Sequence, residues 1–253
     1  MKYLVIITLS FLLLNCKSDA SETVTAQSLI DKAIQVSGGD LMDSTTIHFD
    51  FRDKHYMAFR NKGVFHLERQ FKALIFEEVD SINEVKDVLN NKGFMRFVDN
   101  SPMNVTDTMA AKYAASVNSV HYFSVLPYGL NDAAVNKKRL ADMMIKDHEY
   151  FTIQVTFNQD GGGEDFEDVF IYWINKASYK VDYLAYSYNE SDGLGLRFRE
   201  VYNERYIKGI RFVDYNNYKP NDASISLIKL PELFNNNQLK LLSKIELEEV
   251  TVN

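Results

Sequence analysis

Cysteine is nearly absent from this chain of 253 residues, which holds only Cys16. A single cysteine forms no internal disulfide and no cysteine-based metal cluster, so burial alone must stabilise the fold. The five histidines offer no substitute, because they form no H-E-x-x-H motif and no pair at the spacing of zinc ligands. We therefore expect neither a metal nor another cofactor.

Positive charge is also scarce. The formal net charge is −7, from 28 Lys and Arg against 35 Asp and Glu, and the basic residues form no stripe. This composition disfavours nucleic acid as a partner. It equally disfavours electrostatic docking on anionic lipid, so any membrane attachment would depend on attached acyl chains.

Recognised catalytic motifs are missing as well. The sequence contains no G-x-S-x-G nucleophile motif. Its adjacent carboxylate pairs, Glu77-Glu78 and Glu248-Glu249, would point to opposite faces of a strand and so make no general acid/base pair. These absences favour a non-catalytic role over the rival hypothesis, a periplasmic enzyme acting on an envelope lipid or glycan.

The apolar run from Tyr3 to Leu14 is too short to cross a bilayer as a helix, which takes about 20 apolar residues. It follows the positively charged Lys2 and ends at an abrupt polar switch, Lys17-Ser18-Asp19. A positive start, a short apolar segment and a polar boundary are typical of a secretory signal.

Cys16 stands directly after this signal, where a lipid would be attached. The arrangement resembles a bacterial lipoprotein signal, in which cleavage leaves an acylated cysteine as the first residue. We predict a signal peptide over 1–15, a lipidated tether over 16–24 and a single α+β domain over 25–253. The N-terminal lipid would hold the protein in the membrane, as an outer-membrane lipoprotein of the cell envelope facing the periplasm or the cell surface. The alternative is an ordinary signal peptide with an incidental cysteine.

Two segments show helical spacing. Thr25 is a plausible N-cap for the first, whose apolar residues recur at helical intervals until Gly38-Gly39 ends it. The second covers 106–126 and closes at Pro127. Each has one apolar stripe and needs a sheet to lie on.

Apolar residues alternate with polar ones through 45–100 and 150–220, and turn residues separate the runs. We expect about ten strands, the final one over 239–252, with helices too few to alternate with them, and hence an antiparallel α+β fold. The predicted architecture is one large curved antiparallel β-sheet, half-barrel-like, with the two main helices packed on one face.

Several motifs in the second half carry a family resemblance. They are Val120-His121-Tyr122-Phe123, Leu126-Pro127-Tyr128-Gly129-Leu130-Asn131-Asp132, Tyr172-Trp173, Asp182-Tyr183-Leu184-Ala185-Tyr186, Arg197-Phe198-Arg199-Glu200 and Gly209-Ile210-Arg211-Phe212-Val213-Asp214-Tyr215. In this order they resemble the DUF6503 family of uncharacterised Bacteroidota lipoproteins, which implies a lipoprotein without an established activity. The architecture alone is similar to that of the LolA/LppX-like lipid and lipoprotein carriers.

An aromatic groove is the first candidate site. His121, Tyr122 and Tyr128 fall where the second helix ends, and we expect His121 at the mouth of a groove between helix and sheet. Trp173, Tyr183 and Tyr186 would hold the apolar part of a ligand there. The alternative for His121 is a structural histidine, hydrogen-bonded beneath the loop.

Arg197 and Arg199 are the second candidate, because alternate residues of a strand share one face. Facing inward, they would hold a carboxylate or phosphate head group; facing outward, they would pair with acidic neighbours.

Our leading hypothesis is therefore a lipid-anchored, non-catalytic binder or carrier of an apolar or amphipathic ligand such as a lipid. A structural or interaction lipoprotein with a filled core is a further alternative, and the sequence specifies no oligomeric state.

Overall fold

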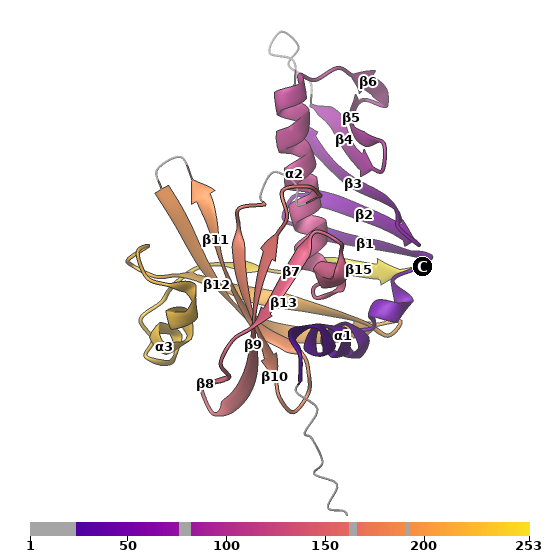
Figure 1. Ribbon diagram of the computed structural model, residues 1–253. Helices are drawn as coiled ribbons and strands as arrows, with labels where there is room; N and C mark the ends of the chain where they lie inside the picture. The colour runs from indigo at the N-terminus through magenta and orange to yellow at the C-terminus, as the bar shows by residue number, and fades with distance from the viewer. Residues whose placement is uncertain (1–23, 76–81, 162–165, 191–192) are drawn as a thin grey trace, which may run out of the picture.

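The computed structural model describes residues 24–75, 82–161, 166–190 and 193–253. Within them, fifteen strands form two antiparallel sheets accompanied by three α-helices (Figure 1). The helices are α1 (Ala26–Val36), α2 (Asp107–Ser124) and α3 (Leu230–Asn235), with short 3₁₀ turns at Gly39–Leu41, Tyr128–Asn131 and Leu227–Lys229. The predicted signal segment, the lipidation site Cys16 and nearly all of the tether lie outside the described residues.

The first sheet has seven strands in the order β15-β1-β2-β3-β4-β5-β6. They are β1 (Thr45–Phe51), β2 (Lys54–Asn61), β3 (Val64–Ala73), β4 (Asn83–Asn90), β5 (Gly93–Val98), β6 (Ser101–Met103) and β15 (Glu248–Val252). Ile47 and Phe49 are buried on the face that α2 covers, while His48 and Asp50 point the other way. The period-two pattern thus gives a sheet with one packed face.

The second sheet has the order β14-β13-β12-β11-β10-β9-β7, with β8 paired to β9. Its strands are β7 (Val135–Arg139), β8 (Met143–Ile145), β9 (His148–Phe157), β10 (Val169–Asn175), β11 (Val181–Glu190), β12 (Gly193–Ile207), β13 (Ile210–Lys219) and β14 (Lys240–Ile245). Both faces of β10 are buried. This strand therefore contributes to two separate cores.

Each face of the second sheet packs against its own helix. On one face, Leu29 and Ala33 of α1 join a cluster with Ile153 and Tyr172. On the opposite face, Phe234 of α3 stacks near Phe198 in a second cluster. Figure 1 shows α1 and α3 on different sides of these strands.

Helix α2 lies across the first sheet and also reaches the second. Val117 packs against Ala58 and Leu67 of the first sheet. Near the end of the helix, Tyr122 and Phe123 contact the α1-side core of the second sheet. Helix α2 is consequently the element that bridges the two sheets (Figure 1).

The sheets also meet where the chain passes from β14 to β15. The backbone N–H of Leu247 donates to Asp214 Oδ1 at 3.0 Å, and Arg205 Nη2 donates to the Leu247 carbonyl at 2.6 Å. Around this point a shared core gathers residues of both sheets, including Phe49 and Phe212. Polar contacts and apolar packing together thus fix the position of one sheet relative to the other.

The α+β class, the first helix after its Thr25 cap and the second helix are confirmed. The single half-barrel-like sheet is wrong, because the described strands form two sheets, each with two free edges. The expectation of both main helices on one face is confirmed only for the end of α2, which joins α1 on one face of the second sheet, whereas the rest of α2 covers the first sheet. The final strand expected over 239–252 divides into β14 and β15, which belong to different sheets.

Candidate functional site: a cavity between helix α2 and the second sheet

A cavity of about 690 Å³ lies between α2 and the second sheet. Its walls come from β3 and β4, from α2, and from four strands of the second sheet. The lining residues are Phe65, Leu89, Ala111, Ala114, Ala115, Asn118, Ser119, Tyr122, Phe123, Phe157, Asp168, Phe170, Tyr186, Tyr188 and Arg199. This volume lies within the range of roughly 300–1,000 Å³ typical of small-molecule sites.

Room for the cavity comes from small residues on one side of α2. Ala111, Ala114, Ala115 and Ser119 recur at three- and four-residue intervals, so they share one helix face. The opposing strands carry large rings instead. Short side chains facing rings leave a space that neither surface fills.

Ring contacts hold the aromatic wall in place. Phe170 stacks on Tyr186, with centroids 5.1 Å apart, and meets Phe157 edge-on at 5.7 Å. Tyr122 and Tyr172 are joined by a hydrogen bond of 3.1 Å between their hydroxyls. Burial raises the pKa of Tyr122, so this hydroxyl stays protonated. The aromatic part of the wall is therefore apolar and packed ring on ring, while Asp168 and Arg199 add charged groups to the lining.

Arg199 lies at one end of this cavity, on β12. Only 7% of its surface is exposed. Its Nη2 donates to the Tyr186 hydroxyl at 2.8 Å, and its guanidinium lies over the Phe123 ring at 3.9 Å. Nε and Nη1 are buried without a hydrogen-bond partner among the described residues.

A smaller cavity of about 230 Å³ adjoins the large one, because Ser119, Phe123 and Arg199 line both. It reaches β1, β13 and β14. Arg199 pairs in register with Asn217, and Asn217 with Ser243, so three polar side chains form a row across neighbouring strands of this cavity.

The structure places His121 away from both cavities. Its Nε2 donates to the Glu68 carbonyl at 2.9 Å, and its ring packs edge-on against Phe49 and Tyr56 beneath the first sheet. It is 1% exposed, and burial lowers its pKa to about 3. His121 is thus a neutral core histidine, and its predicted place at a groove mouth is wrong.

The other predicted site residues separate into three groups. Tyr122, Tyr186 and Arg199 meet at the large cavity. Trp173 and Tyr183 lie on the opposite face of the second sheet, packed with α3. The remaining two line neither cavity: Tyr128 borders a third hollow of about 250 Å³ beside Arg60, and Arg197 lies near Tyr188.

Sequence reasoning did not identify Phe123, Phe170 or the small residues of α2 as parts of the site. The sequence does contain one usable signal, because odd- and even-numbered residues of a strand point to opposite faces of the sheet. Residues 170, 172 and 174 of β10 face α1, whereas 171 and 173 face α3. Tyr183 and Tyr186 of β11 are likewise an odd number of residues apart, so they point to opposite faces and could not both line one groove.

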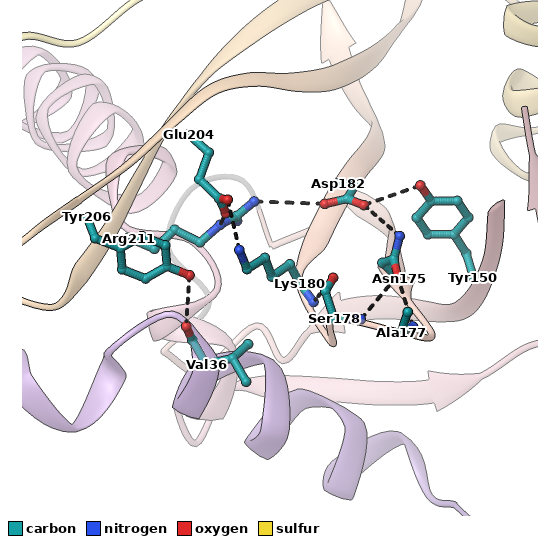
Figure 2. Close-up of polar contacts among 10 residues, drawn as sticks. All are labelled: Val36, Tyr150, Asn175, Ala177, Ser178, Lys180, Asp182, Glu204, Tyr206 and Arg211. Atoms are coloured by element: carbon teal, nitrogen blue, oxygen red, sulfur yellow. Dashed lines mark hydrogen bonds and ion pairs between the residues drawn. The ribbon is translucent and has the colours of Figure 1, made fainter. Parts of the chain in front are cut away.

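A polar network occupies the α1 end of the second sheet (Figure 2). Buried Arg211 forms an ion pair with Glu204, which also accepts from Lys180 at 2.8 Å. Asp182 accepts from the Tyr150 hydroxyl at 3.2 Å, and burial raises the pKa of this carboxyl. None of these residues lines either cavity. Their contacts tie neighbouring strands together.

A histidine–carboxylate pair lies on the outer face of the first sheet. His55 Nδ1 is 2.6 Å from Asp50 Oδ1 in a hollow lined mainly by charged side chains. Both side chains are exposed at 40% or more. An exposed ion pair without an apolar wall is a common surface feature, and it does not support an enzyme site.

A family model for a family of unknown function, DUF6503, matches residues 2–247. The chain belongs to this family. The resemblance found in the aromatic motifs is thereby confirmed over nearly the whole chain. A search of the curated proteins finds no match to this DUF6503 chain.

Two solved structures resemble the DUF6503 fold distantly. A LolA superfamily protein from Nitrosomonas europaea is 13% identical, with a TM-score of 0.44, covering 91% of this chain and 92% of the other. A DUF1329 family protein from Desulfovibrio piger is 8% identical, with a TM-score of 0.39, covering 90% and 92%. Within the described part of the chain, no helix is long and apolar enough to cross a membrane.

Proposed function

We propose that this DUF6503 protein is a non-catalytic, lipid-anchored cell-envelope protein that binds an apolar or amphipathic ligand between α2 and the second sheet. The observation that carries the proposal is the unfilled cavity of about 690 Å³, walled by Phe157, Phe170 and Tyr186 on one side and by alanines on the other. A structural lipoprotein would fill such an interior with side chains.

The hydrophobic effect supplies the driving force for binding. Each buried methylene contributes about 0.8 kcal/mol, so an alkyl chain entering this space gains several kcal/mol. The rings that line the cavity are already held by one another, and little side-chain freedom is lost on binding. The wall therefore suits a flexible apolar chain better than a polar substrate.

Native mass spectrometry of the protein gently extracted from membranes tests this function. We expect the wild-type chain to carry a non-covalent lipid. Ala114→Phe should abolish or strongly reduce that mass difference, because Ala114 lines the cavity and a ring there fills it. Thr108→Phe is the matched control, since it adds the same ring at an exposed position of α2.

Retention of the lipid by Thr108→Phe and its loss from Ala114→Phe would support the cavity as the binding site. Wild-type protein that carries no lipid, or equal retention by both variants, would contradict the proposal. Thermal unfolding of both variants shows whether a loss reflects occupancy of the cavity or collapse of the fold.

A further inference from the structure

Arg199 is a buried cation without a carboxylate partner. Among the described residues it forms no ion pair, and both Nε and Nη1 lack acceptors. Other buried arginines of the chain are paired, such as Arg69 and Arg96, which share Asp87. An unpaired buried charge is strongly unfavourable, so Arg199 requires an explanation that its neighbours do not.

The aromatic contacts of Arg199 leave two of its donors, Nε and Nη1, buried and without partners among the described residues. Phe123 covers the flat face of the guanidinium at 3.9 Å, which stabilises the cation through the ring electrons. The N–H groups lie in the guanidinium plane and are directed elsewhere. Nε and Nη1 belong to different edges, and each edge combines one free donor with an N–H of Nη2. The edge that Tyr186 leaves open matches the two oxygens of a carboxylate or phosphate.

The smaller cavity is electrostatically suited to an anion. Its lining contains two cations, Arg199 and the exposed Arg52, and no Asp or Glu. Asn217 and Ser243 add neutral polar groups beside Arg199. A pocket lined by two cations and by no carboxylate is unusual in a chain of net charge −7, and it adjoins the large cavity.

We propose that Arg199 binds the anionic head group of an amphiphile whose tail occupies the large cavity. The head group, a carboxylate or phosphate, would accept from the free donor and the Nη2 N–H of the edge that Tyr186 leaves open, where the two cavities adjoin. This inference rests on the proposed function and adds the chemical class of the ligand to it.

Binding of three probes to the full chain tests the inference. The chain is kept in solution with a neutral amphipathic polymer, freed of lipid, and titrated with dodecyl phosphate, dodecan-1-ol and inorganic phosphate. Dodecyl phosphate should bind about tenfold or more tightly than the alcohol, as expected for charge-assisted hydrogen bonds. Arg199→Met should remove this preference and leave binding of the alcohol nearly unchanged.

Arg197→Met is the matched control, because Arg197 is on the same strand and face but lines neither cavity. It should keep the preference. Arg199→Lys provides a second variant if the methionine variant does not fold. It retains the charge without the planar edge and should lose most of the preference for dodecyl phosphate.

Equal affinity for dodecyl phosphate and dodecan-1-ol would overturn the head-group assignment while leaving the apolar site intact. Inorganic phosphate binding as tightly as dodecyl phosphate would also overturn it, by indicating a site for a small free anion. If neither twelve-carbon probe binds, the proposed function itself fails.

Discussion

At the scale of single residues, burial decides which polar groups serve binding and which serve the fold. His121 and Arg199 are both buried, and both have atoms without partners. His121 is neutral among the rings of the first sheet, whereas the Arg199 guanidinium lies beside an unfilled space. From sequence, both were candidates of similar appearance, because the pattern contains no information on what surrounds each side chain.

The neutral His121 predicts a pH dependence of stability. Its folded-state pKa of about 3 is below the unfolded value near 6.5. The unfolded state therefore binds more protons between these values, and stability falls as the pH falls from 6.5 toward 3. Between pH 7 and pH 5 the free energy of unfolding should decrease by about 2 kcal/mol from this residue alone.

Urea unfolding at pH 7 and pH 5 measures that decrease. The glutamine of His121→Gln cannot titrate. The free energy of unfolding of this variant should therefore decrease by about 2 kcal/mol less than that of the wild type, since the other ionisable groups are common to both proteins. Identical decreases in the two proteins would contradict the assignment of His121 as a neutral core residue.

At the scale of elements, close backbone approach fixes the end of α1. Gly38 has φ +78°, and a Cβ built on it would lie 2.2 Å from the carbonyl oxygen of Gly209 in the turn between β12 and β13. The Tyr206 hydroxyl also donates to the Val36 carbonyl at 3.1 Å (Figure 2). The Gly38-Gly39 stop was predictable from sequence, but this contact partner was not.

Gly38→Ala should destabilise the protein more than Gly63→Ala. Gly63 has a similar φ of +83° but open space around its Cβ direction, so its substitution costs only the backbone strain of about 1 kcal/mol. Gly38→Ala adds a steric clash with backbone and should lose at least about 1 kcal/mol more. Chemical denaturation of the two variants measures the difference, and equal losses would contradict the close approach.

At the scale of the whole molecule, the sequence indicated the strands but not their assignment to sheets. The alternation of apolar and polar residues identifies a half-buried strand but not the sheet that the strand joins. The sequence therefore predicts one strand where the structure has β14 and β15. The pairing of β14 with β13 and of β15 with β1 reveals the change of sheet, and Leu247 contacts Asp214 and Arg205 at that point. The cavity depends on the same long-range placement, because it lies between α2 and a sheet remote in sequence.

Anchoring at Cys16 is a prediction for the whole molecule too. Cys16→Ser should transfer the protein from the membrane fraction to the soluble periplasm, because the apolar attachment is lost. Folding should be preserved, since the described fold begins at residue 24. Cell fractionation measures the location of the variant, and a proteolysis assay measures its folding. A variant still held in the membrane would contradict the lipoprotein prediction.

Photo-crosslinking in cells tests the central claim, occupancy of the large cavity, most directly. p-Benzoylphenylalanine replaces Phe157, which lines the cavity, or Phe151, which is on the same face of β9 but lines neither cavity. After illumination, mass spectrometry should find a lipid-sized adduct on the protein substituted at Phe157 and none on that substituted at Phe151. No adduct at Phe157, or equal adducts at both positions, would contradict the account.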